Sequence, residues 1–297
     1  MHVGISRPPT PPYPVPDVDA AVIAQEAERL GFESVFYGEH PIRPVEQAGY
    51  SVHRDGVPFF QDTLVALARI SAVTTTIRFG GGVFLAPEHN PVQFAKELAT
   101  LDHYGGGRLL VGCGVGWSQV ECELLGGVWD RRWAQTRESV RIMKQLWTQD
   151  TVTYDGEFYR IPPVQLFPKP ASTPHPPVLI GARASERTFA RVVDYADGWL
   201  PAFVTRETVA GAPAVVEAAR RRLDDLAADA GREPGSLQIS AMIRGLPRGD
   251  RADGRELRGR ITALSDAGAD RVLVSMPTVT SEQEVGDALH RLAEAVL

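Results

Sequence analysis

Residues 77–101 read IRFGGGVFLAPEHNPVQFAKELATL, and this stretch contains one complete unit of the fold. Its first nine residues, Ile77 to Leu85, are mostly apolar or glycine and predict a strand. Asn90 and Pro91 then supply a helix cap followed by proline at the first helical position. Phe94, Leu98 and Leu101 recur at helical spacing, so a helix with one buried face follows the strand.

The same succession of strand and helix recurs along the chain. Asp155-Gly156 interrupts it, because this pair between residues 151–154 and 157–161 predicts a β-hairpin. Eight units that end in a helix favour a closed (β/α)₈ barrel over an open doubly wound sheet. We therefore expect one α/β TIM-barrel domain over residues 1–297, with insertions after strand two and between helix four and strand five. The predicted strands are residues 2–6, 34–37, 77–85, 108–112, 178–180, 198–200, 237–243 and 271–274. The predicted helices begin near Asp17, near Leu64 and at Asn90, and then cover residues 132–147, 185–195, 206–230, 255–267 and 281–296.

Composition excludes several classes of protein. The chain has 297 residues and a formal net charge of −6, which disfavours nucleic acid as a partner. Two cysteines cannot build a disulfide framework or a four-ligand structural zinc site, so we expect no metal. No apolar stretch approaches the roughly 18 residues of a membrane span, and the start of the chain reads as a strand rather than a secretory signal. We expect a cytoplasmic protein that does not contact membranes.

In such a barrel the active site lies where strands give way to helices. The residues at these points include Ser6, the Glu39-His40 pair, and three glycine clusters. The clusters are Gly81-Gly82-Val83, Gly112 to Val115 including Gly114, and Gly181-Ala182-Arg183. Glycine lets the backbone approach a flat ligand closely, although each glycine could also relieve crowding inside the barrel. The turn at Gly181, followed by Ser185 as a helix cap, offers an anion site for a cofactor phosphate.

His40 is the best candidate for acid–base chemistry, because imidazole titrates near neutrality. Alternatively, His40 only hydrogen-bonds the barrel wall. His89 could belong to a plain helix cap, and Trp117 could either stack on a ring or close the top of the barrel.

Common catalytic motifs are missing. Gly112-x-Gly114-x-Gly116 follows a strand, but its third glycine is one position early for a dinucleotide-binding motif. There is no G-x-S-x-G nucleophile elbow and no H-E-x-x-H metal motif, which argues against a common hydrolase or zinc protease.

Several ordered segments are similar to the bacterial luciferase-like monooxygenase superfamily, in particular its branch that depends on coenzyme F420. The match covers most of the first two hundred residues, whereas the last third matches only in its strand–helix rhythm. The matching segments are residues 27–35 leading to Glu39-His40, then 80–91, 101–117, 154–159 and 196–199.

The resemblance implies a homodimeric barrel that holds the deazaflavin F420 at its open rim. It places a non-proline cis peptide bond at Gly82-Val83, behind the ring, and an acidic residue–histidine pair at Glu39-His40. The turn at Gly181-Ala182 would contact the phosphate-bearing tail. The predicted proton donor is His40, oriented by Glu39. The predicted cofactor-binding residues are Ser6, Glu39, His40, Gly81, Gly82, Val83, Gly112, Gly114, Val115, Gly181, Ala182 and Arg183.

One departure from the family bears on the substrate. The sugar-phosphate dehydrogenases of this family carry a glutamate acid near the end of strand four, and the matching position here is Val115. We therefore expect F420-dependent reduction of an activated C=C, C=N or C=O bond in another small molecule. The alternatives are an FMN-dependent monooxygenase fed by a separate reductase and a barrel that binds a cofactor without turnover. Substrate choice is expected from residues 41–60, with Tyr50, His53, Phe59 and Phe60, and from residues 162–177.

Overall fold

In the computed structural model, which describes residues 1–7, 17–42, 44, 60–245 and 253–297, eight parallel strands close into a barrel. Closure comes from β11, which pairs with β10 on one side and with β1 on the other. A short strand, β9 (Ala202–Phe203), adds to β10 outside this circle. In barrel order the strands are β1 (His2–Arg7), β2 (Ser34–Tyr37), β3 (Arg78–Leu85), β4 (Leu109–Gly114), β7 (Val178–Ile180), β8 (Gly198–Trp199), β10 (Gln238–Arg244) and β11 (Arg271–Ser275).

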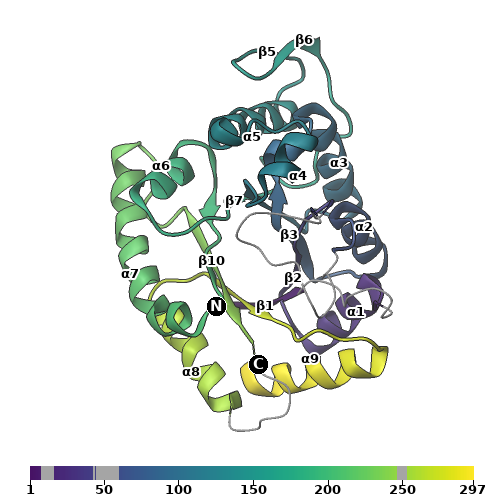
Figure 1. Ribbon diagram of the computed structural model, residues 1–297, viewed down its shortest axis with the longest axis vertical. Helices are drawn as coiled ribbons and strands as arrows, with labels where there is room; N and C mark the ends of the chain where they lie inside the picture. Colours follow the sequence, from purple (N-terminus) through teal and green to yellow (C-terminus); the bar gives the residue numbers. More distant parts are fainter. Residues whose placement is uncertain (8–16, 43, 45–59, 246–252) are drawn as a thin grey trace.

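The helices surround the strands in a ring (Figure 1). Capping residues mark where helices start. Asn90, for example, accepts hydrogen bonds from the backbone N–H groups of Val92 and Gln93 at the start of α3. The helices are α1 (Ala20–Leu30), α2 (Thr63–Val73), α3 (Pro91–Tyr104), α4 (Gln119–Leu124), α5 (Arg132–Thr148), α6 (Glu186–Tyr195), α7 (Arg206–Asp229), α8 (Asp253–Asp266) and α9 (Glu282–Val296). Two 3₁₀ turns, η1 (Ala86–Glu88) and η2 (Trp129–Arg131), precede α3 and α5.

The predicted hairpin is confirmed as β5 (Val152–Asp155) and β6 (Arg160–Val164), which pair antiparallel and project beyond the ring of helices (Figure 1). The proline-rich return to the barrel contains two cis X–Pro bonds, at Phe167-Pro168 and Thr173-Pro174. This hairpin and its return form the predicted insertion between the fourth unit's helix, α5, and the fifth barrel strand, β7.

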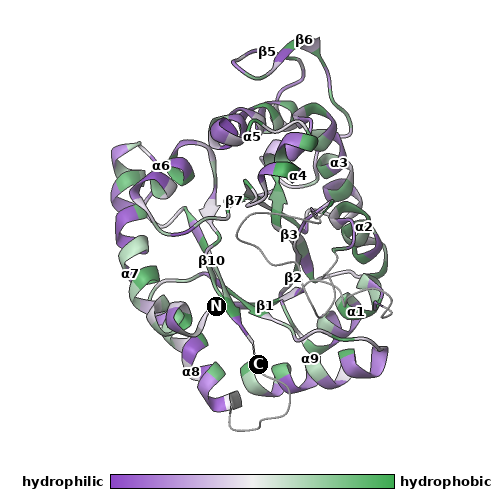
Figure 2. Ribbon diagram, viewed as in Figure 1, coloured by the Kyte–Doolittle hydropathy of each residue, from purple (hydrophilic) through white to green (hydrophobic). Residues whose placement is uncertain are grey.

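Apolar side chains fill two layers. The inner layer packs along the barrel axis and the outer layer packs between strands and helices. In the ribbon coloured by hydropathy, the surrounding helices alternate hydrophobic and hydrophilic residues (Figure 2). The inner layer consists of Phe36, Leu110, Leu179, Leu200 and Leu273, with Val83 and Met242 packed against it.

A buried ion pair lies at the N-terminal end of the barrel, opposite the functional rim. The guanidinium of Arg271, the first residue of β11, donates to Glu33 (Nη2 to Oε1, 2.6 Å) and to Ser240 (Nη1 to Oγ, 3.0 Å). Only 3% of the Arg271 side chain is exposed, so Glu33 is needed to balance a charge that water cannot reach.

The predicted barrel is confirmed, and the differences concern boundaries. Helix α1 starts at Ala20 rather than near Asp17, because Asp17 pairs with Arg7 and Asp19 provides the cap. Strand β4 runs on to Gly114 because it follows β3 to the Leu85–Gly114 pair. Strand β9 was not predicted. Among the described residues, no helix is both long and apolar enough to cross a bilayer.

Candidate active site

The predicted site residues come together at one end of the barrel. Because all eight strands are parallel, Ser6, His40, Val83, Val115 and Arg183, which end or follow different strands, share the C-terminal rim. The predicted substrate residues Tyr50, His53 and Phe59 lie outside the described residues, whereas Phe60 is described.

The inner layer gives way to small residues at this rim. Side chains two residues apart on a strand point to the same face, so each bulky inward residue is followed by another inward position closer to the mouth. On four strands that next position is glycine or serine. Neighbouring side chains fill the space at three of them, since a Cβ atom built on Gly38, Gly112 or Gly181 would lie 3.1, 2.8 or 2.3 Å from Phe60, Leu200 or Val83. The pairs are Phe36 and Gly38, Leu110 and Gly112, Leu179 and Gly181, and Leu273 and Ser275.

Val83, on β3, packs against the inner layer at this rim. The Gly82-Val83 peptide bond is cis, as predicted, and lies where the β3–β4 register shifts between Gly81 and Phe84. A Cβ atom built on Gly114 or Gly181 would lie only 2.5 or 2.3 Å from the Val83 side chain. These two glycines thus make room for Val83.

The alternative interpretation of the glycines, that they relieve crowding inside the barrel, is confirmed for Gly81 and Gly112. A Cβ atom on Gly81 would overlap the Phe84 ring, and one on Gly112 would lie 2.2 Å from the Gly81 carbonyl oxygen. Gly81 therefore leaves space for the Phe84 ring within β3, and Gly112 allows β4 to pack closely against β3. Backbone contact of these residues with a cofactor stays a prediction.

His40 is oriented by Glu121, and the predicted orientation by Glu39 is wrong. The imidazole Nδ1 lies 2.7 Å from Glu121 Oε2. Glu121 is fully buried in α4, and its other oxygen accepts a hydrogen bond from the Ile42 backbone N–H at 3.3 Å. Adjacent residues on an extended segment point to opposite sides, which separates Glu39 from the imidazole that follows it.

Trp117 forms a hydrogen bond with the other ring nitrogen of His40. Its indole N–H donates to His40 Nε2 at 2.9 Å, and the imidazole lies between the rings of Trp117 and Phe60, with centroids 5.1 and 5.0 Å away. An indole N–H can only donate, so Nε2 carries no proton here. Nδ1 therefore holds the ring proton and donates it to Glu121. Trp117 thus contacts His40, and the two alternatives for it, stacking on a ring and closing the top of the barrel, both stay predictions.

Glu39 forms a separate pair with His89. Glu39 Oε2 accepts from the Leu85 backbone N–H at 2.6 Å and lies 2.9 Å from His89 Nε2, whose ring stacks on Phe94. Burial by itself disfavours the charged imidazole, but the hydrogen bond and the negative charge of Glu39 outweigh it and raise the pKa of His89. The pair fixes the end of β3 against the start of α3.

Glu88 adds a third buried carboxyl group near the mouth. Only 8% of the residue is exposed, and neither carboxyl oxygen has a hydrogen-bond partner among the described residues. Burial, together with the charges of Glu121 and Glu39, raises the pKa of Glu88 to about 8. Gly116 makes space for this side chain, since a Cβ there would lie 3.3 Å from Glu88 Oε1.

The turn after β7 lies at the surface of the rim. Ser185 caps α6 by accepting from the Thr188 backbone N–H at 3.1 Å, and the Ala182 carbonyl accepts from the Trp199 indole at 2.9 Å. Arg183 and the first residues of α6 are exposed. The turn is therefore held rigidly with its helix N-terminus open to solvent, which suits the predicted phosphate contact.

Sequence reasoning missed Glu121 and Glu88. Ser118 to Glu121 has the S-x-x-E spacing of a helix capping box, and Ser118 does cap α4 by accepting from the Glu121 backbone N–H. The Glu121 side chain turns to His40 instead of back to the cap, which the local pattern cannot reveal. Among the residues that the structure describes, no cluster of His, Cys, Asp and Glu could hold a metal ion.

Comparison with known proteins places these residues in a family context. The family model described as luciferase-like monooxygenase matches residues 8–262. An uncharacterized protein of Mycobacterium tuberculosis is 34% identical over 283 residues, which is 93% of each chain. An FMNH₂-dependent dimethylsulfone monooxygenase of Pseudomonas putida is 30% identical over 82% of this chain and 62% of its own. An F420-dependent glucose-6-phosphate dehydrogenase of Nakamurella multipartita is 32% identical over 70% of this chain and 60% of its own.

Solved structures share the fold at lower identity. Monooxygenase RslO1 from Streptomyces bottropensis superposes with a TM-score of 0.82 at 20% identity, covering 99% of this chain and 98% of the other. An F420-dependent secondary alcohol dehydrogenase gives a TM-score of 0.75 at 16% identity, covering 98% and 99%.

Proposed function

The chain belongs to the luciferase-like monooxygenase family, and we propose that within it this protein is an F420-dependent oxidoreductase. It would transfer a hydride between the deazaflavin and a small organic molecule with an activated C=C, C=N or C=O bond. The observation that carries the proposal is the Glu121–His40–Trp117 chain of hydrogen bonds at the barrel mouth. Hydride transfer to such a bond must be accompanied by transfer of a proton. These hydrogen bonds orient the His40 imidazole, which could donate that proton.

We expect the mouth to hold a planar cofactor. Glycine or serine follows the bulky inner residues on four strands, and Val83 offers an apolar surface beside the opening. Val83 and Gly82 would support the ring, and the turn of Gly181, Ala182 and Arg183 would hold the phosphate-bearing tail. When bound, F420 would act as the hydride donor in its reduced form or as the hydride acceptor in its oxidised form.

His40 would take up a proton at Nε2 when the substrate is oxidised. In the reducing direction Nε2 would first be protonated from solvent and would then give that proton to the substrate. In the present arrangement Nε2 accepts from Trp117, so the indole must move aside before a substrate oxygen or nitrogen can take its place. Glu121 would stabilise the imidazolium form, because its buried carboxylate is already bonded to Nδ1. The rings of Trp117 and Phe60 both contact the imidazole and would restrict its contact with water.

A second candidate is an FMNH₂-dependent monooxygenase supplied by a separate reductase. The similarity to the dimethylsulfone monooxygenase extends over 82% of this chain, against 70% for the F420-dependent dehydrogenase. The same mouth would then hold FMN.

Titration with F420 and with FMN, followed by fluorescence, separates these candidates. We expect tight binding of F420 and weaker binding of FMN; tight FMN binding with none for F420 would refute the proposal. Stopped-flow oxidation of reduced F420 against a panel of enones, imines and ketones then tests turnover. Cofactor binding without oxidation of F420 by any of the panel would favour a barrel that only binds its cofactor. A homodimer and a cytoplasmic location stay predictions.

A further inference from the structure

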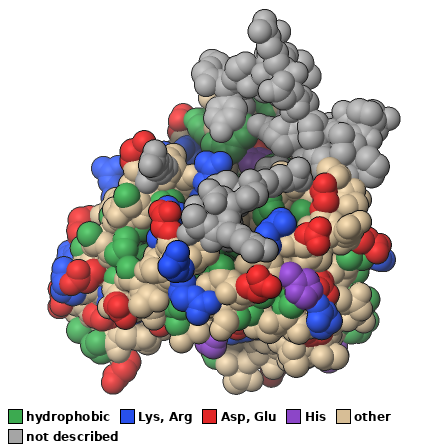
Figure 3. Space-filling model, turned by 90° about the horizontal axis from the view of Figure 1, so that it is seen from below, with side chains coloured by type: hydrophobic (Ala, Val, Ile, Leu, Met, Phe, Trp, Pro, Cys, Tyr) green, Lys and Arg blue, Asp and Glu red, His purple; other side chains and the backbone are tan. Residues whose placement is uncertain are grey.

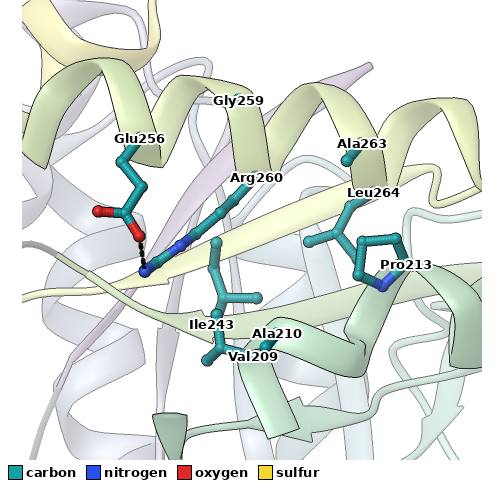
Figure 4. A pocket seen from close by; sticks show the side chains of 9 residues that line it. All are labelled: Val209, Ala210, Pro213, Ile243, Glu256, Gly259, Arg260, Ala263 and Leu264. Carbon is teal, nitrogen blue, oxygen red and sulfur yellow. Dashed lines mark hydrogen bonds and ion pairs between the residues drawn. The ribbon is translucent and has the colours of Figure 1, made fainter. Parts of the chain in front are cut away.

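The end of β10 places an arginine in the barrel mouth. Ile243 points outward and lines a pocket of about 490 Å³ between α7 and α8, together with Val209, Pro213 and Arg260 (Figure 4). Successive side chains on a strand point to opposite faces, so Met242 and Arg244 point into the barrel. Met242 does so, since it packs on the inner layer and its Cε lies 3.4 Å from a Cβ built on Gly82.

Arg244 lies across the mouth from Val83. In the barrel order β3, β4, β7, β8, β10, strand β10 is the fourth neighbour of β3, which is the opposite position in a circle of eight. Contact between Met242 and Gly82 confirms that the two strands face each other. Arg244 is two residues closer to the mouth than Met242, a rise of about 7 Å along the strand.

The guanidinium of Arg244 is uncompensated. Arg244 is exposed, and within the described part of the chain it has no hydrogen bond or ion pair, whereas the buried Arg271 and the partly buried Arg220 are each paired with a carboxylate. Its register partner on β11 is Ser275, which also faces inward. A guanidinium presents N–H donors in a planar fork that matches the two oxygens of a carboxylate.

Charge is distributed unevenly around the mouth. The carboxylates of Glu39 and Glu121 are buried beneath the side that carries His40, and Arg244 stands on a different side. On the outer surface, by contrast, acidic and basic side chains are interspersed (Figure 3). An anionic group entering the mouth is therefore attracted to the β10 side and repelled from the His40 side.

We propose that Arg244 is the carboxylate subsite of this barrel, so that the substrate is an unsaturated or carbonyl-bearing carboxylic acid. The inference rests on the proposed function, because the same molecule would present its reducible bond to His40. Its carboxylate binds at β10, which directs the uncharged, reducible end toward β2 and β3. Substrates with a neutral group in place of the carboxylate lose this anchor.

The test compares two ligands of nearly equal shape, 4-oxopentanoate and 4-oxopentanamide. Their dissociation constants are measured by saturation-transfer NMR, which detects weak binding, on the protein alone and on the protein saturated with its cofactor. In the wild type we expect the carboxylate to bind about tenfold or more tightly than the amide, as a charge-assisted hydrogen bond predicts. Arg244→Gln should reduce this ratio to about twofold or less, and Arg244→Lys should keep part of it, because a lysine retains the charge but not the fork.

Arg255→Gln is the matched control, since it removes the same charge from an exposed position on α8 and should leave the ratio unchanged. A preference that survives in folded Arg244→Gln, or an absent preference in the wild type, overturns the proposal. If Arg244→Gln does not fold, the proposal is overturned by an Arg244→Lys variant that still prefers the carboxylate over the amide as strongly as the wild type does. If Arg244→Gln weakens only the binding of reduced cofactor, Arg244 serves the cofactor and the proposal is also wrong. Failure of the proposed function is read separately, in the F420 titration.

Discussion

Replacing Glu88 by Gln should change how stability depends on pH. Glu88 ends the η1 turn beneath the mouth, is 8% exposed, and has no partner for either oxygen among the described residues. Burial, and then the charges of Glu121 and Glu39, raises its pKa from 4.5 to about 8. The folded protein therefore holds a proton on Glu88 at neutral pH that the unfolded chain has lost.

The sign of the effect follows from this difference. Between pH 4.5 and about 8 the folded state binds more protons than the unfolded state, so stability falls as the pH rises and levels off above that window. Each pH unit is worth about 1.4 kcal/mol, which gives at most about 5 kcal/mol over the window. Because relaxation of the surrounding protein offsets part of the cost of burying a charge, we expect about half of this, roughly 2 kcal/mol. Glutamine has nearly the same shape and cannot ionise.

Urea unfolding at pH 5 and pH 9 measures the effect. Glu88→Gln should be as stable as the wild type at pH 5 and more stable by about 2 kcal/mol at pH 9. Glu123→Gln, an exposed position on α4, corrects for the loss of one negative charge. A difference between Glu88→Gln and wild type that is the same at both pH values would show that Glu88 is not held protonated.

Three further predictions concern the site and the base of the barrel. His40→Gln should slow turnover by about 10² to 10⁴ while cofactor affinity changes little, and an unchanged rate in stopped-flow assays would remove His40 from the reaction. Glu121→Gln should lower kcat at nearly constant KM, whereas Glu39→Gln should affect kcat less; equal losses would contradict the assignment of Glu121 as the positioning residue. Glu33→Gln should cost about 3 kcal/mol in urea unfolding at pH 7, because Arg271 then stays buried without its partner. Burial opposes ionisation of Glu33, but Arg271 holds its pKa below the usual 4.5, so the penalty should fade as the pH falls below that value; a penalty that stays constant down to pH 3 would contradict this pairing.

Local sequence determined the elements and their order. Asn90-Pro91 and Asp155-Gly156 act through the backbone of their own neighbourhood, so a helix start and a hairpin could be predicted from a few residues. Eight such units imply a closed barrel, and closure alone brings His40, Val83 and Gly181 to one rim. This is why the location of the site could be predicted without any tertiary contact.

Only the tertiary structure decided which side chains pair within that rim. Glu39 precedes His40 in the chain, yet it bonds His89, and Glu121, 81 residues away from His40, provides the carboxylate. Arg244 likewise gained its position opposite Val83 from the strand order. Pairing depends on which face of a strand a residue occupies and on which strands lie across the barrel, and proximity in sequence carries little of that information.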